Sequence, residues 1–131
     1  MVAIVAMVMG ACAMPRAADQ QSTPPSVIRE GFASYYARSL DGKTTASGVP
    51  FDNDAFVAAH PTYPFGTLVR VTNLRNRRTV TVRVIDRGPT RAARTKGVII
   101  DLSRAAAEAL GFLKAGRTRV RLEVVPERTT G

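Results

Sequence analysis

Asp86 is the residue whose position most clearly suggests chemistry. It ends the alternating stretch "VTVRVID" (80–86) and is followed by Arg87, Gly88 and Pro89. A strand fixes the backbone of its last residue, and a Gly-Pro turn restricts the chain that follows. Such a carboxylate could transfer protons. It could equally cap the turn and pair with Arg87, and the residues alone leave both interpretations open.

His60, the only histidine, lies in "AAHPTYPFGT" (58–67). We expect it to orient Asp86 or a substrate, although a lone histidine often has a purely structural hydrogen bond. Asp101, in "IIDLS" (99–103), could be a second carboxylate of the site. A structural hydrogen bond near the start of a helix is the simpler interpretation.

Two other kinds of site find little support. A hydrolase triad could be assembled from Ser34 or Ser103 with the histidine and Asp86, but no nucleophile-elbow motif accompanies either serine. One histidine and one cysteine, Cys12, make no metal-ligand cluster. No metal and no cofactor are therefore expected.

The elements that must position these residues are mainly strands. Alternating or apolar runs predict strands at 31–37, 66–74, 78–86, 97–102 and 118–125. Residues 103–111 predict a short helix, with Ser103 as its N-cap and Gly111 at its C-terminal end. Short strands with few helices favour a small closed barrel, because closure removes exposed edges.

The 131 residues suffice for one domain, and their formal net charge is +9. Residues 1–30 hold two basic and two acidic side chains, so the whole excess lies in 31–131. Basic residues fill the outward positions of the predicted strands. This pattern favours a polyanionic partner such as nucleic acid, anionic lipid or an anionic wall polymer.

The N-terminal stretch "MVAIVAMVMGACAMP" predicts an export signal, with an apolar run too short to span a bilayer. Cys12 follows small residues as in a bacterial lipobox, which predicts a lipid anchor; cleavage after Ala13 or Ala18, or a buried cysteine, are the alternatives. We expect a signal region at 1–12, a flexible tether at 13–30, a folded domain at 31–126 and a disordered tail at 127–131. Export argues against nucleic acid as the partner.

Five blocks in order give the sequence its family resemblance: "ASYYA" (33–37), "TASGVPFD" (45–52), "AAHPTYPFGTLVRVTN" (58–73), "VIDRGP" (84–89) and "IIDLSRAAAEALG" (99–111). Together they resemble the bacterial rare lipoprotein A (RlpA)-like family. The resemblance implies a mainly β fold, a six-stranded double-psi β-barrel with one or two short helices. The sequence departs from the family pattern at Tyr35, Tyr36, Ala37, Val49 and Val57.

The resemblance also implies a function. Members of the family are endolytic lytic transglycosylases that cleave peptidoglycan glycan strands, favour peptide-free strands and leave 1,6-anhydro ends during wall remodelling or septation. It implies His60 and Asp86 as the key residues. We expect substrate contacts from Ser34, Tyr35, Tyr36, Thr45, Ser47 and Arg87, and structural roles beside the site for Gly88, Pro89 and Asp101.

The resemblance further implies an outer-membrane lipoprotein facing the periplasm, anchored through Cys12, with division or wall proteins as further partners. Lytic cleavage suits a site with one well-held carboxylate, because the C6 hydroxyl of the sugar replaces the activated water of a hydrolase. The alternative is a non-catalytic glycan-binding envelope protein on the same barrel.

Overall fold

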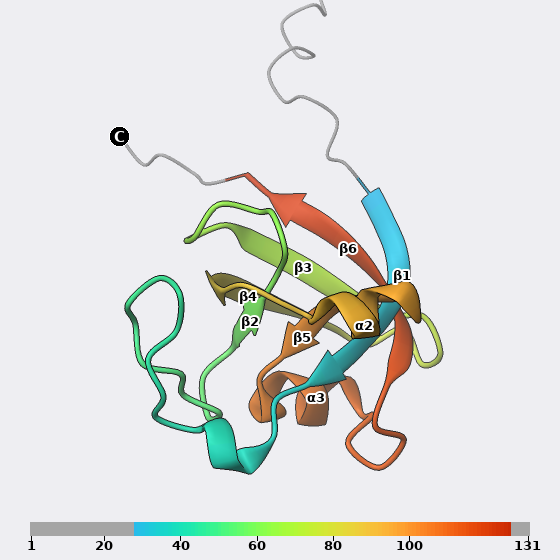
Figure 1. Cartoon of the computed structure of the whole chain (residues 1–131). Helices are drawn as coiled ribbons and strands as arrows, with labels where there is room; N and C mark the ends of the chain where they lie inside the picture. The colour runs from blue at the N-terminus through green and yellow to red at the C-terminus, as the bar shows by residue number, and fades with distance from the viewer. Residues whose placement is uncertain (1–27, 127–131) are drawn as a thin grey trace, which may run out of the picture.

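Six strands close into a barrel around an apolar interior (Figure 1). The computed structural model describes residues 28–126. The strands are β1 (Ile28–Tyr35), β2 (Val57–Ala59), β3 (Leu68–Asn73), β4 (Thr79–Asp86), β5 (Val98–Leu102) and β6 (Thr118–Val125). Their order around the barrel is β1-β5-β2-β4-β3-β6. The predicted mainly β, six-stranded barrel is confirmed.

Two strand pairs are parallel, β1 with β5 and β2 with β4, while the other neighbours run antiparallel. Parallel neighbours need a crossover connection. The chain runs from β1 to β5 through β2, β3 and β4, and from β2 to β4 through β3. These crossovers bring the ends of β1, β2, β4 and β5 together on one side of the barrel. The segments that follow β1 and β4 start from this point (Figure 1).

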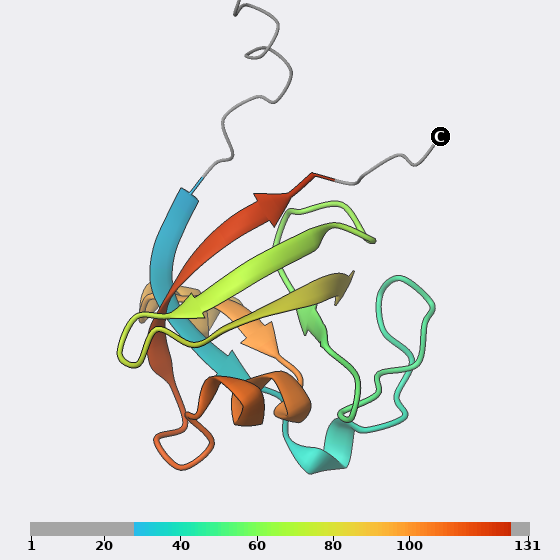
Figure 2. The same ribbon diagram turned by 180° about the vertical axis from the view of Figure 1, so that it is seen from behind.

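The core follows from alternation along the strands. Val69 and Val71 of β3, Val82 and Val84 of β4, and Leu122 of β6 point inward and are at most 1% exposed. Helix α3 (Arg104–Leu110) covers one end of the barrel (Figure 2). Its three buried residues, Ala106, Ala107 and Leu110, belong to the same core cluster.

The limits of α3 are those that the sequence predicts. The Ser103 side chain accepts a hydrogen bond from the Ala106 N–H, and Gly111 ends the helix in the left-handed conformation with φ of 79°. The second of the one or two short helices that the fold class predicts is α2 (Arg91–Thr95), whose residues the sequence did not single out; Thr90 caps it through the Ala93 N–H. A single 3-10 turn, η1 (Arg38–Leu40), follows β1.

Other boundaries differ from the expectations. β1 starts at Ile28, three residues before the predicted strand, because Arg29 and Glu30 pair with β6. The three-residue β2 was not predicted, since so short a run carries no periodicity. Cys12, residues 13–27 of the expected tether and the tail at 127–131 lie outside the described residues. No helix within 28–126 is long and apolar enough to cross a bilayer.

Asn73 ties three elements together from inside the barrel wall. It is 1% exposed; its amide nitrogen donates to the Leu110 carbonyl at 2.8 Å. Its amide oxygen accepts from the Arg75 N–H at 2.9 Å and from the Thr118 hydroxyl at 3.0 Å. The end of β3, the end of α3 and the start of β6 therefore share one side chain.

We expect Asn73→Ala to lower the free energy of unfolding by roughly 2–4 kcal/mol, because it leaves buried hydrogen-bond donors and acceptors without partners. Urea denaturation measures this quantity. Thr81→Ala, on the exposed face of β4, is the control and should change it by less than about 0.5 kcal/mol. An Asn73→Ala value as small as that of the control would contradict this role.

Candidate active site

A row of paired residues crosses four neighbouring strands where the barrel crossovers meet. Ser34 of β1 is paired with Asp101 of β5, Asp101 with Ala59 of β2, and Ala59 with Asp86 of β4. Residues paired in this way across adjacent strands present their side chains on the same face of the sheet. The small Ala59 therefore lies between two carboxylates that face the same way.

Three donors converge on the Asp86 carboxylate. The Tyr36 hydroxyl donates to Oδ2 at 2.5 Å, while the main-chain N–H groups of Ala46 and Arg87 donate to Oδ1 at 2.9 and 2.8 Å. Ala46 belongs to the loop that joins β1 to β2. The carboxylate is thus held by the residue after β1, by the residue after β4 and by this loop at once.

Asp101 has a different environment. It is mostly buried and accepts a hydrogen bond from the Ser34 hydroxyl. Burial raises the pKa of the Asp101 carboxyl, the Ser34 hydrogen bond lowers it, and the negative charge of Asp86 raises it further. The net direction is upward, so Asp101 holds its proton to a higher pH than an ordinary aspartate.

Both carboxylates line one cavity of about 510 Å³. This volume is within the usual range for small-molecule sites. Of the predicted site residues, the cavity collects Ser34, Tyr35, Tyr36, Thr45, Asp86, Arg87, Gly88 and Asp101. It also collects residues that the sequence did not single out: Ala37, Leu40, Lys43, Thr44, Phe51, Thr90 and Ala93.

Stacked rings form one wall of this cavity. The Tyr36 ring lies on Phe51 with centroids 3.9 Å apart and an angle of 12° between the planes. Burial, followed by the hydrogen bond to Asp86, raises the pKa of the Tyr36 hydroxyl well above its usual range, so it stays a donor. Tyr35 donates its hydroxyl to the Leu113 carbonyl at 2.7 Å. Phe51 lies within the quoted block 45–52, but no signal in the sequence pairs it with Tyr36.

The Arg87 guanidinium points away from the neighbouring carboxylate. It donates to the carbonyls of His60 and Tyr63 at 3.2 and 2.9 Å, and its carbon lies 4.1 Å from the centre of the Phe65 ring. The ion pair with Asp86 that the sequence left open is not among the ion pairs of residues 28–126. Arg87 instead fastens the segment 60–65 to the end of β4.

Gly88 and Pro89 hold the turn after Asp86. Gly88 has φ of 147°, a conformation that disfavours any side chain. A Cβ there would lie 3.5 Å from both the Ala59 Cβ and the Asp101 Oδ2. The peptide bond to the buried Pro89 is cis. Glycine therefore leaves free the space between the paired carboxylates.

His60 lies on a different cavity, which Arg29, Arg94 and Ile99 also line. Its Nδ1 accepts hydrogen bonds from the main-chain N–H groups of Thr62 and Tyr63 at 3.1 and 3.0 Å. Its ring stacks on Tyr63 with centroids 3.6 Å apart. The imidazole is thus held away from the cavity of the carboxylates.

Charge and burial agree with this placement. Burial, and then the positive charges of Arg87 and Arg29, lower the pKa of His60 to about 4, so the imidazole is neutral near pH 7. His60 reaches Asp86 only through the main chain, where its N–H donates to the Asp86 carbonyl at 3.1 Å. A role in orienting Asp86 fits this geometry, whereas direct proton transfer by the imidazole stays a prediction without such support.

The remaining predicted contact residues organise the loop. Thr45 donates its hydroxyl to the Val49 carbonyl at 2.6 Å and lies 3.0 Å from the Ser47 hydroxyl. Ser47 does not line the cavity; its N–H donates to the Ile85 carbonyl at 3.2 Å. Within residues 28–126, no group of three His, Cys, Asp or Glu side chains is placed to hold a metal ion.

Comparisons with known proteins show which family the chain resembles. The family model described as "Lytic transglycolase" matches residues 28–122. A "Probable endolytic peptidoglycan transglycosylase RlpA" of Treponema pallidum is 54% identical over 94 residues, which are 72% of this chain and 28% of that protein. The match covers 32% of the length of the "Endolytic peptidoglycan transglycosylase RlpA" of Pasteurella multocida. The chain thus spans about a third of the length of these two relatives.

Solved structures share the barrel. The apo expansin of Clavibacter michiganensis superposes with a TM-score of 0.60 at 27% identity, covering 79% of this chain and 53% of that one. The Streptomyces papain inhibitor gives a TM-score of 0.61 at 28% identity, covering 80% of this chain and all of that one. With the matched family model, these findings show that the chain belongs to the lytic transglycolase family, the RlpA-like double-psi β-barrels that its sequence motifs predict.

Proposed function

We propose that this domain is an endolytic lytic transglycosylase that cleaves the glycan strands of peptidoglycan. The observation that carries the proposal is the pair of carboxylates, Asp86 and Asp101, in one cavity with a wall of stacked aromatic rings. Aromatic faces suit sugar rings, and paired carboxyl groups suit proton transfer at a glycosidic bond. The names of the relatives support the same reaction.

The reaction needs one proton donor and one proton acceptor. The donor protonates the glycosidic oxygen as the bond from C1 of the muramic acid residue to that oxygen breaks. The C6 hydroxyl of the same residue attacks C1, closes the 1,6-anhydro ring and releases its proton to the acceptor. No water is consumed, and the proton balance is restored when the two carboxyl groups exchange a proton with solvent.

The two carboxyl groups are suited to different halves of this cycle. Asp101 is the proposed donor, because burial and the charge of Asp86 keep it protonated to a higher pH than usual. Asp86 is the proposed acceptor, because three converging hydrogen-bond donors fix the position of its two carboxylate oxygens. This division assigns Asp101 a part in the chemistry beyond the structural role expected from the sequence.

The expected location is the cell envelope, where peptidoglycan lies. The outer-membrane lipid anchor on Cys12 is part of the same proposal, and it rests on the residues around that cysteine. Division or wall proteins as partners rest on the family resemblance alone.

We expect the purified domain to release products with 1,6-anhydromuramic ends from peptide-free glycan strands. Asp86→Asn should reduce the rate at least about 100-fold, a typical loss for general acid–base catalysis. Mass spectrometry of the products detects the 1,6-anhydro ends and gives the rate of their release by each variant. Asp52→Asn, which removes an exposed loop carboxylate, should keep the activity. Binding of the strands without product, unchanged by Asp86→Asn, would favour the non-catalytic glycan-binding alternative.

The pH profile tests Asp101 as the donor. A donor must be protonated, so kcat/KM should fall as pH rises through the Asp101 pKa. The Ser34 hydrogen bond lowers that pKa, so Ser34→Ala should raise it and move the alkaline limb to higher pH. Asp101→Asn should abolish the limb together with most of the activity. An alkaline limb that stays in place in Ser34→Ala would assign the proton to another group.

His60 is proposed as a positioning residue, and the conservative variant tests this. His60→Ala should lower kcat at least about tenfold, because the segment 60–65 loses its anchor and Asp86 shifts. The side-chain oxygen of His60→Asn can accept from the Thr62 and Tyr63 N–H groups in place of Nδ1, as asparagine does in tight turns. This variant should therefore recover most of the rate with an unchanged pH profile. Equal inactivity of both variants would indicate that the imidazole itself takes part in the chemistry.

A further inference from the structure

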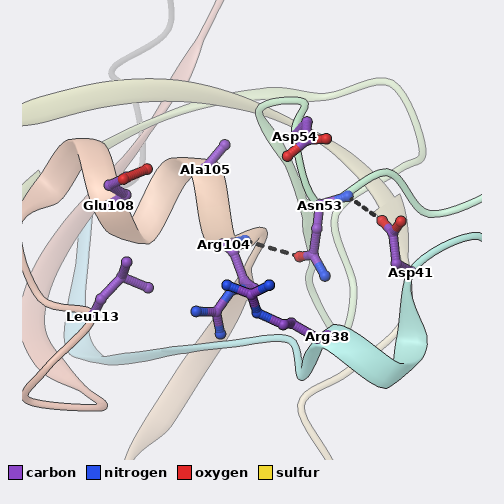
Figure 3. Close-up of a pocket in the computed structure, with 8 residues that line it drawn as sticks. All are labelled: Arg38, Asp41, Asn53, Asp54, Arg104, Ala105, Glu108 and Leu113. Atoms are coloured by element: carbon purple, nitrogen blue, oxygen red, sulfur yellow. Dashed lines mark hydrogen bonds between the residues drawn. The ribbon is translucent and has the colours of Figure 1, made fainter.

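Figure 3 shows a second cavity, of about 630 Å³. The segment after β1 lines both this cavity and that of the carboxylate pair: Ala37 and Leu40 line the first, and Arg38 and Asp41 the second. The Arg104 guanidinium carbon lies 5.4 Å from the centre of the Tyr35 ring. Tyr35 of the first cavity thus contacts Arg104 of the second, so a strand that extends beyond the first cavity past Tyr35 would meet Arg104.

Two arginine side chains meet in this second cavity. The guanidinium groups of Arg38 and Arg104 lie beside each other near its centre (Figure 3). The one ion pair among residues 28–126 joins Arg121 to Glu30, so neither guanidinium has a carboxylate partner there. Two like charges held close together repel, and an anion bound between them would relieve that repulsion.

The carboxylates of the cavity do not supply that anion. Asp41 accepts a hydrogen bond from the Asn53 N–H at 2.7 Å, on the far side of Asn53 from Arg104 (Figure 3). Asp54 and Glu108 lie across the cavity from the two guanidinium groups (Figure 3). The cavity thus has an acidic side and a basic side, and Arg104 on the basic side faces the Tyr35 ring.

We propose that Arg38 and Arg104 form a subsite for the free lactyl carboxylate of a muramic acid residue in the bound strand. This inference rests on the proposed function, since it names a feature of the strand that the same groove would cleave. Guanidinium groups bind carboxylates through paired, charge-assisted hydrogen bonds. In a strand that carries stem peptides, this carboxyl group is an uncharged amide with a peptide attached. The subsite would therefore give the expected preference for peptide-free strands a physical cause.

The test is a binding measurement in the Asp86→Asn background, where the strands stay intact. The first probe is peptide-free glycan strands, and the second is the same strands with the lactyl carboxylates converted to methylamides. Strands with stem peptides form a third arm, which supplies carboxylates from the peptides instead. We expect affinity for the first probe to exceed that for the other two by about tenfold, as the loss of a charge-assisted hydrogen bond would give.

Arg38→Gln and Arg104→Gln should each remove most of this difference by weakening only the binding of peptide-free strands. Arg70→Gln, an exposed arginine on β3, removes the same charge elsewhere and should leave the difference unchanged. Equal binding of free and methylamide strands, or an equal loss for both probes in the arginine variants, would overturn the proposal. Arginine-dependent binding of peptide-bearing strands would overturn it as well, in favour of a peptide carboxylate.

The outcome is separable from that of the cleavage assay. A strand-selective loss of binding without any 1,6-anhydro product would retain the carboxylate subsite and reject the enzyme. Product formation with equal binding of the probes would retain the enzyme and reject the carboxylate subsite. Thermal unfolding of each variant, at constant ionic strength, shows whether a loss of binding reflects a loss of fold.

Discussion

Ala59 lies between Asp86 and Asp101 because β2 pairs in parallel with β4 and antiparallel with β5. The two aspartates are therefore two strands apart, at about 10 Å between their backbones, and the methyl group of Ala59 lies between their side chains. A larger residue at either Ala59 or Gly88 would occupy the space between them. The strand register that closes the barrel thus also sets the width of the site.

The two carboxylates differ in the hydrogen-bond donors that surround them. Asp86 receives hydrogen bonds from a tyrosine and from two main-chain amides, whereas Asp101 has Ser34 as its hydrogen-bond donor. The Arg87 guanidinium and the His60 imidazole, which is neutral near pH 7, are both directed away from the two carboxylates. Within residues 28–126 the two carboxylates are therefore held by hydrogen bonds and not by an ion pair.

The sequence predicts the fold well where periodicity or capping is strong. The helix from Ser103 to Gly111 and the strand at 118–125 appear as expected, since each has a clear pattern. It places Asp86 at a strand end, but it leaves the direction of Arg87 open, because the ring of Phe65 and the carbonyls that attract its guanidinium come from another segment. The orientation of His60 was equally hidden: the register shift between Ala58 and Ala59 changes which way the next side chain faces. The approach of Asp101 to Asp86 depends on the three-residue strand β2, which pairs with both β4 and β5 and has no local pattern of its own.

Two of the three donors to Asp86 are main-chain N–H groups, those of Ala46 and Arg87. Almost any residue can provide such a donor, so the loop between β1 and β2 can change its side chains without losing its hold on the carboxylate. Lys43, Thr44 and Phe51 on that loop face the cavity. The loop can therefore change the side chains that line the cavity while its main chain still holds Asp86.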